Sequence, residues 1–111
     1  MDLVNDIETL RKRLNTSIIK LRDYGRELAE AEMNYKIALR QEALKLRSDG
    51  MAVTLINQIV YGIPEVAKKR YARDIAETMN TVAQENIQSI KLQIRILESQ
   101  VQREYGANLP K

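Results

Sequence analysis

The sequence contains no cysteine, no histidine, no phenylalanine and no tryptophan. Without cysteine and histidine there is no disulfide framework, and carboxylate clusters are the only side-chain ligands left for a metal ion. The usual general base of enzymes is missing as well. These absences predict a protein that is not an enzyme and has no catalytic, metal or cofactor site.

Glycine and proline are also scarce, with four glycines and two prolines among 111 residues. The five tyrosines are the only aromatic residues, whereas a compact globular core usually contains more and larger rings. Charged residues make up 30% of the chain, and most of the rest are aliphatic or amide side chains. This composition favours elongated helices that pack through aliphatic side chains.

Long apolar runs are absent, since none approaches the roughly 18 residues that a membrane-spanning helix needs. The opening stretch, MDLVNDIETLRKR, has acids where a secretory signal has bases, and no apolar core follows it. We therefore expect a cytoplasmic protein that does not contact a membrane. The net charge of +3 is too small to indicate nucleic-acid binding by itself.

Two long segments without internal proline show helical periodicity, from about residue 3 to 47 and from about 64 to 105. Pro64 suits a first helical position, and Gly106 with Pro110 should leave 106–111 as a tail. The first apolar stripe consists of Leu3, Ile7, Leu10, Leu14, Ile18, Leu21, Leu28, Tyr35, Leu39 and Leu46. The second consists of Ala72, Ala76, Met79, Ala83, Ile87, Ile90, Ile94, Leu97 and Val101.

Because the two segments have matched lengths and a short connection, they predict an antiparallel hairpin. A short helix of about residues 54–61, with Thr54 as its N-cap, should lie at the bend between corners at Gly50 and Gly62. The predicted fold is therefore all-α: one domain of residues 1–111, a hairpin of two long helices with a short helix at the bend. We expect it to assemble into a helical bundle.

Gly25 lies on the first apolar stripe, where a glycine costs about 1 kcal/mol relative to alanine. Close approach of the facing helix would compensate for that cost. A kink after Tyr24 is the alternative interpretation.

A second, weaker set of apolar residues accompanies each stripe. One hairpin seam cannot cover both sets, and exposed apolar surface of this length is typical of an association site. We therefore expect a homo-oligomer, with a dimer that forms a four-helix bundle as the favoured state. The self-association candidates are Ile19, Met33, Ile37, Leu44, Tyr71, Ile75, Val82 and Ile96, and Val4 and Ala29 belong to the same set.

The bend has two interpretations. In the first, Leu55, Ile56, Ile59 and Val60 form the apolar face of a short helix that seals the open end of the hairpin. In the second, residues 46–61 form a helix-turn-helix, because Leu46, Gly50, Ile56 and Ile59 match its spacing. Asn57, Gln58 and Tyr61 would then read base edges.

The densest basic stretch, KKRYAR, lies just after the bend. Lys68, Lys69, Arg70 and Arg73 could hold phosphates while Tyr71 stacks on a base. The alternative is a solvated helix face, neutralised by the i,i+4 pairs Arg70–Asp74 and Arg73–Glu77.

From residue 25 onward the chain resembles a family of small helical proteins encoded by phages and prophages of Gram-positive bacteria. The likeness is carried by Ala31, Glu32, Tyr35, Arg47, Gly50, Thr54, Leu55, Ile56, Arg70, Asp74, Glu85, Lys91, Arg95, Leu97 and the closing Gln102, Arg103, Glu104 and Tyr105. It implies a protein of the early, replication and recombination region, acting in the host-cell cytoplasm. No family site residue is carried over.

Three functions follow from these observations. The first is a non-enzymatic interaction or scaffold protein, accessory to phage DNA metabolism. The second is a direct DNA-binding protein that uses the bend or the basic stretch. The third is a small inhibitor that binds a host protein.

Overall fold

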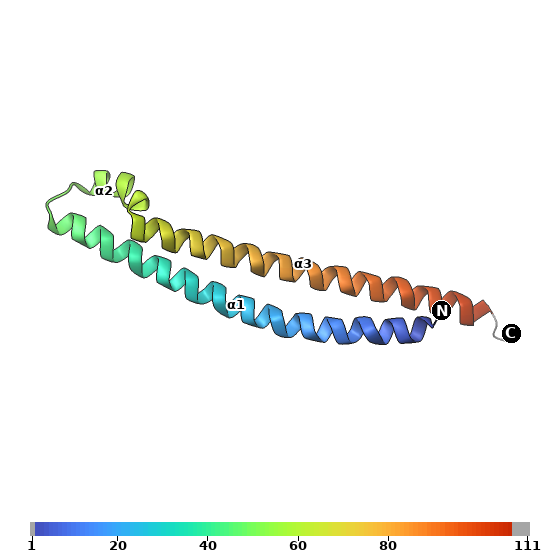
Figure 1. Cartoon of the computed structure of the whole chain (residues 1–111). Coiled ribbons are helices and arrows are strands. Elements are labelled where there is room, and N and C mark those ends of the chain that lie inside the picture. The colour runs from blue at the N-terminus through green and yellow to red at the C-terminus, as the bar shows by residue number, and fades with distance from the viewer. Residues whose placement is uncertain (1, 108–111) are drawn as a thin grey trace. The chain divides into compact units, whose positions relative to one another are not determined.

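A computed structural model describes residues 2–107, which fold into helices almost throughout (Figure 1). Helix α1 spans Leu3–Ser48, α2 spans Val53–Ile59, a 3₁₀ turn η1 spans Val60–Gly62, and α3 spans Pro64–Ala107. The predicted all-α hairpin with a short helix at the bend is confirmed. Helix α3 continues through Gly106, where the sequence predicted its end, and residues 108–111 of the predicted tail lie outside the described residues.

Residue contacts divide the described chain into two compact units, and each is described by itself. The terminal unit comprises residues 2–23 and 81–107, so it joins the first half of α1 to the second half of α3. The bend unit comprises Tyr24–Asn80, with the second half of α1, the bend and the start of α3.

In the terminal unit the two helices run antiparallel. Arg11 of α1 forms an ion pair with Glu98 of α3 at 4.0 Å. Six residues later in α1, Ser17 accepts a hydrogen bond of 3.2 Å from the side-chain amide of Asn86, which precedes Glu98 in α3. The core of this unit consists of Ile7, Leu10, Ile90 and Ile94, with Leu14, Leu97 and Val101 packed against them.

One position of the predicted stripe is wrong in this unit. Ile18 is 42% exposed, and its neighbour Ser17 is buried instead, with 9% of its surface exposed. A buried hydroxyl needs a hydrogen-bond partner, and Asn86 supplies it. Because an unpaired buried hydroxyl is costly, the bond from the exposed Asn86 to the buried Ser17 favours this register of the helices in this unit.

Helix α1 ends in a Schellman motif, which starts the bend. Gly50 has a φ of +86°, the left-handed region that glycine adopts without a steric cost. Its N–H donates to Arg47 O at 3.0 Å, and the N–H of Met51 donates to Leu46 O at 3.1 Å. The predicted corner at Gly50 is therefore confirmed.

The second half of the bend differs from the prediction. Helix α2 begins after Ala52, which has extended backbone and no side-chain cap, so Thr54 is not the N-cap. Gly62 ends η1 without a positive φ. The change of direction comes at Ile63, whose extended backbone, with a ψ of 129°, is the conformation favoured before a proline.

The core of the bend unit joins the bend to both long helices. Val66 of α3 is 0% exposed and belongs to one cluster with Ile56 of α2 and Val60 of η1. Ile56 is 5% exposed and Val60 is 3% exposed. Residues 53–62 therefore form a lid over the core of this unit. Leu55 and Ile59, predicted to belong to the same apolar face, are instead 45% and 38% exposed. The remaining members of this core are Tyr35, Leu39, Ala43, Leu46, Met51 and Ile63.

Gly25 does not mark a close approach of the two backbones. A Cβ built at Gly25 would lie 3.7 Å from the side-chain oxygen of Asn80, which is ordinary van der Waals contact. Helix α1 runs through this position. We therefore predict that Gly25→Ala raises the free energy of unfolding by about 0.5–1 kcal/mol, measured by urea denaturation, because alanine has the higher helix propensity.

Gly50→Ala is the matched control for this prediction. The same added methyl meets no atom within 4 Å, but the backbone is left-handed. The variant should therefore lose about 1–2 kcal/mol. A Gly25→Ala protein that loses stability would show that the packing at this point requires glycine.

Candidate interaction surfaces

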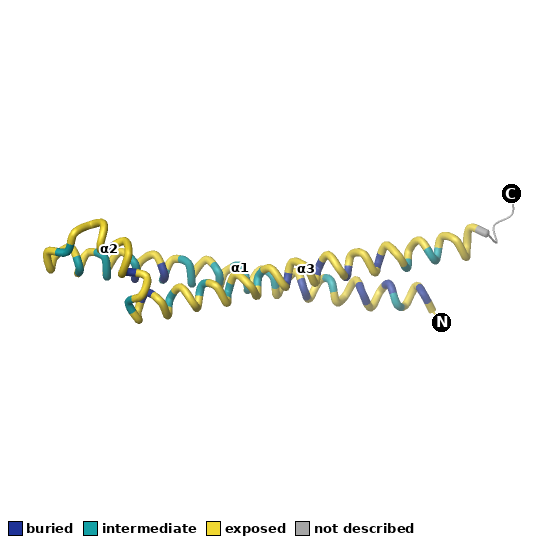
Figure 2. Tube along the Cα trace, turned by 90° about the horizontal axis from the view of Figure 1, so that it is seen from above, coloured by how far each residue is buried: buried dark blue, intermediate teal, exposed yellow. Residues whose placement is uncertain are grey.

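The second apolar set predicted from the sequence is exposed on both long helices (Figure 2). Each of the eight self-association candidates has about half of its surface or more open to solvent. In the terminal unit these are Ile19 at 57%, Val82 at 54% and Ile96 at 53%; in the bend unit they are Met33 at 53%, Ile37 at 47%, Leu44 at 62%, Tyr71 at 70% and Ile75 at 49%. The fold of a single chain therefore leaves this surface uncovered in the part that the structure describes.

In the bend unit, the exposed apolar residues of α1 lie on the face directed away from α3. Tyr35 is buried in the shared core, and Met33 and Ile37 are two residues from it on either side. Two residues correspond to about 200° around an α-helix. Leu44 follows Ile37 by seven residues, which returns to the same face. We name Met33, Ile37 and Leu44 the α1 strip.

The exposed apolar residues of α3 in this unit likewise lie on the face directed away from α1. Arg73 contacts α1 and is half-buried, and Tyr71 and Ile75 are two residues from it on either side. Thus they lie about 200° around the helix from the facing side. We name Tyr71 and Ile75 the α3 strip. The sequence predicted these residues, but it placed them beside the core stripes rather than across the helix from them.

The α1 strip is flanked by positive charge. Lys36, Arg40 and Arg47 are exposed, and in the part of the chain described here none of them forms an ion pair. The only carboxylate between residues 33 and 47 is Glu42, whose side chain is 17% exposed and bonds to Lys45 at 3.1 Å. This face therefore combines apolar and uncompensated cationic side chains.

The α3 strip has a different flank. Asp74 is exposed next to Ile75 but bonds to Arg73, while Lys68 and Arg70 are exposed three residues and one residue before Tyr71. The charges around the α3 strip are consequently of both signs.

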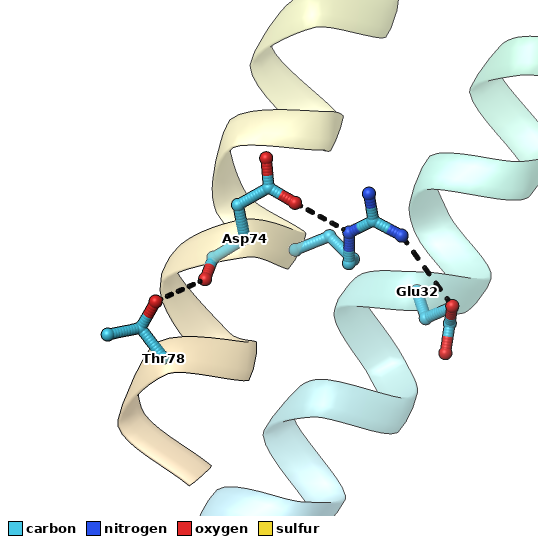
Figure 3. A network of polar contacts seen from close by, with 4 residues as sticks. Glu32, Asp74 and Thr78 are labelled. Carbon is cyan, nitrogen blue, oxygen red and sulfur yellow. Dashed lines mark hydrogen bonds and ion pairs between the residues drawn. The ribbon is translucent and has the colours of Figure 1, made fainter. Parts of the chain in front are cut away.

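Arg73 connects α3 to α1 in the bend unit. Its Nε donates to Asp74 at 2.8 Å, and its Nη1 lies 3.7 Å from a carboxylate oxygen of Glu32 (Figure 3). Its guanidinium lies 5.0 Å from the centroid of the Tyr35 ring. The hydrogen bond to Asp74 is the main cause that raises the pKa of Arg73 above its ordinary value. Because arginine is already charged at physiological pH, these contacts persist across that range. Thr78 donates back to the Asp74 carbonyl at 3.0 Å.

The structure separates the seven nucleic-acid candidates into two groups. Arg73 is held by Glu32, Asp74 and Tyr35, with 22% of its side chain exposed, and Lys69 is half-buried. The exposed candidates are Asn57, Gln58, Tyr61, Lys68 and Arg70.

The contacts of the basic stretch also differ from those predicted. Arg70 lies 5.7 Å over the ring of Tyr61, joining α3 to the bend, and is not among the described ion pairs. Arg73 pairs with Asp74 and Glu32 rather than with Glu77. The exposure of Ile59 also removes one of the two buried apolar positions that the helix-turn-helix interpretation required. DNA binding stays a prediction.

Hollows on the described surface are shallow. One of them, of about 460 Å³, is lined by Arg95, Ile96, Ser99, Gln102 and Arg103 in the terminal unit. The described residues contain no group of three or more acidic side chains arranged to hold a metal ion. Among them, no helix is apolar over a stretch long enough to cross a membrane. The predicted absence of enzymatic activity stays a prediction.

Comparison of the chain with protein-family models, with curated proteins and with solved structures returns no match.

Proposed function

We propose that this chain is a non-enzymatic helical interaction protein that acts by associating with further copies of itself. The observation that carries the proposal is the exposure of apolar side chains on faces that the hairpin core cannot reach, above all Leu44 at 62% and Tyr71 at 70%. Burial of apolar surface contributes about 25 cal/mol per Å², so covering such side chains favours association. Their helical spacing suits a partner helix.

The resemblance to phage-encoded proteins supports a context for this activity. The assembly would act as a scaffold or accessory in phage DNA metabolism and would have no catalytic function of its own. A self-associating helical protein needs no histidine, cysteine or bound metal, which agrees with the composition of the chain.

The proposal predicts that substitutions in the α1 strip weaken self-association. A variant with Met33→Gln, Ile37→Gln and Leu44→Gln loses apolar surface but keeps good helix-forming residues at exposed positions. We expect light scattering to show an association constant at least about tenfold lower than that of the unchanged chain, because three apolar contacts are lost. Circular dichroism should show unchanged helix content.

Val53→Gln with Leu55→Gln is the control variant. These residues are exposed and apolar, at 55% and 45%, but they lie on the lid rather than on the strips. The control should associate like the unchanged chain. Equal association of all three proteins would refute a role for the α1 strip.

A further inference from the structure

In the terminal unit, the outer face of α3 carries two exposed apolar side chains, Leu92 and Ile96. Ile90 and Ile94 are buried in the core shared with α1. Leu92 is two residues from each of them, and Ile96 is two residues after Ile94. Because two residues correspond to about 200° around an α-helix, both side chains lie on the face directed away from α1. Leu92 is 54% exposed and Ile96 is 53% exposed.

Opposite charges lie at the two ends of this apolar pair. Glu85 precedes Leu92 by seven residues, and Arg103 follows Ile96 by seven. Seven residues complete about two turns, so the four side chains lie along one line of the helix. We name Glu85, Leu92, Ile96 and Arg103 the terminal strip.

The two charges of the terminal strip are not compensated within the helix. Glu85 and Arg103 are both exposed, and neither is among the described ion pairs. The residues three and four positions before and after each of them are uncharged. Each charge is therefore available to an opposite charge of another molecule.

The spacing of the terminal strip is symmetric about residue 94. Along the chain the steps between its four members are seven, four and seven residues. A two-fold contact joins one surface to the same surface of a second copy. If the two α3 helices run antiparallel with the axis at residue 94, Leu92 of each copy lies against Ile96 of the other. Glu85 of each copy then lies close to Arg103 of the other.

We infer that two copies of this chain associate through the terminal strip, with antiparallel α3 helices and a two-fold axis at residue 94. Charge selects this arrangement, because a parallel contact in the same register would bring Glu85 close to Glu85 and Arg103 close to Arg103. The inference rests on the proposed function and adds a contact in the terminal unit. The α1 and α3 strips of the bend unit are not part of it.

One like-charge pair opposes this contact. Arg95 is exposed and precedes Ile96 by one residue, about 100° around the helix, so it lies at the edge of the terminal strip. Because it is next to residue 94, it would lie close to Arg95 of the other copy. Arg95→Gln should therefore strengthen association, and a weaker association of this variant would contradict the position of the axis.

Charge reversal at the ends of the strip is the main test. Glu85→Arg places a cation opposite Arg103 of the other copy, and Arg103→Glu places an anion opposite Glu85. Sedimentation velocity should show that each variant alone associates at least about tenfold more weakly than the unchanged chain. The variant that carries both substitutions keeps the composition and net charge of the chain, and it should associate like the unchanged chain.

A mixture of the two single variants shows whether the charges meet between copies. Each variant supplies the charges that the other lacks, so an equimolar mixture should associate more strongly than either variant alone. Both positions are exposed, and glutamate and arginine are good helix formers, so we expect both variants to fold, with helix content checked by circular dichroism.

A distance between labels tests the antiparallel orientation. The chain has no cysteine, so Gln88→Cys provides a single attachment site for a spin label at an exposed position of α3. With the axis at residue 94, the two labelled positions would be about 18 Å apart along the helices, at 1.5 Å per residue. With helix axes about 10 Å apart, the distance measured by pulsed electron paramagnetic resonance should be about 20 Å. A distance of about 10 Å would indicate parallel helices and overturn the inference.

The remaining outcomes separate the inference from the proposed function. If the charge-reversal variants associate like the unchanged chain, or if their mixture does not recover association, the contact lies elsewhere. The inference then fails, and the proposed function stands. If the unchanged chain is a monomer at every concentration, the proposed function fails together with the inference.

Discussion

Replacing Ile90 with alanine should lower the free energy of unfolding by about 2–5 kcal/mol, the range found when a buried large aliphatic side chain is truncated. Ile90 is 2% exposed and belongs to the core cluster of the terminal unit. The alanine would lose the packing that Ile90 has in the cluster with Ile7, Leu10 and Ile94. Chemical denaturation followed by circular dichroism, in dilute solution, measures the change.

Ile96→Ala is the matched control, since it removes the same atoms from the same helix in the same unit. Ile96 is 53% exposed, so the free energy of unfolding should change by less than about 1 kcal/mol. Both variants should be measured in dilute solution, because Ile96 is one of the self-association candidates. At high concentration the Ile96→Ala substitution would also weaken assembly. Equal costs for the two variants would contradict the assignment of the facing sides in this unit.

Ile56→Ala should likewise cost about 2–5 kcal/mol. Ile56 is 5% exposed and packs in the cluster that contains Val60 and Val66. Helix α2 has only seven residues, too few to be stable without tertiary packing. Loss of the Ile56 contacts should therefore also release the lid, and hydrogen exchange of the amides in 53–62 should accelerate.

Ile59→Ala is the control in this case. It lies three residues from Ile56 in the same short helix but is 38% exposed, so it should cost less than about 1 kcal/mol and leave the exchange rates nearly unchanged. A larger cost for Ile59 than for Ile56 would favour the helix-turn-helix interpretation, which required Ile59 in the core.

The sequence predicted the hairpin correctly because its periodicity is strong. Apolar residues at steps of three and four define the facing sides of both long helices. Pro64 is the first residue of α3, and Gly50, with its positive φ, follows the end of α1; both signals depend only on the local backbone. One exception involves a polar residue. Ser17 was missed because a buried hydroxyl depends on a partner, Asn86, that lies 69 residues away in the sequence.

The lid shows a second limit of sequence patterns. Leu55, Ile56, Ile59 and Val60 are all apolar, and a helical projection alone does not say which of them the core can receive. Packing against Val66 and Tyr35 selects Ile56 and Val60 and leaves Leu55 and Ile59 exposed. Which of these four residues is buried therefore depends on the tertiary arrangement of α1 and α3.

The candidate surfaces were predicted residue by residue, but their arrangement was not. The sequence identified Met33, Ile37, Tyr71 and Ile75 as apolar residues outside the seam. The structure shows which side of each helix contacts the other helix, and therefore that the two strips lie on opposite sides of the bend unit. A single two-fold contact between copies can therefore cover only one of the two strips.

Sedimentation equilibrium of the unchanged chain is the most direct test of the central claim, that apolar side chains left uncovered by the hairpin are covered by further copies. Measured from low micromolar to several hundred micromolar, the average mass should rise with concentration well above the 12.8 kDa of one chain. A mass that stays at 12.8 kDa over the whole series would contradict the account.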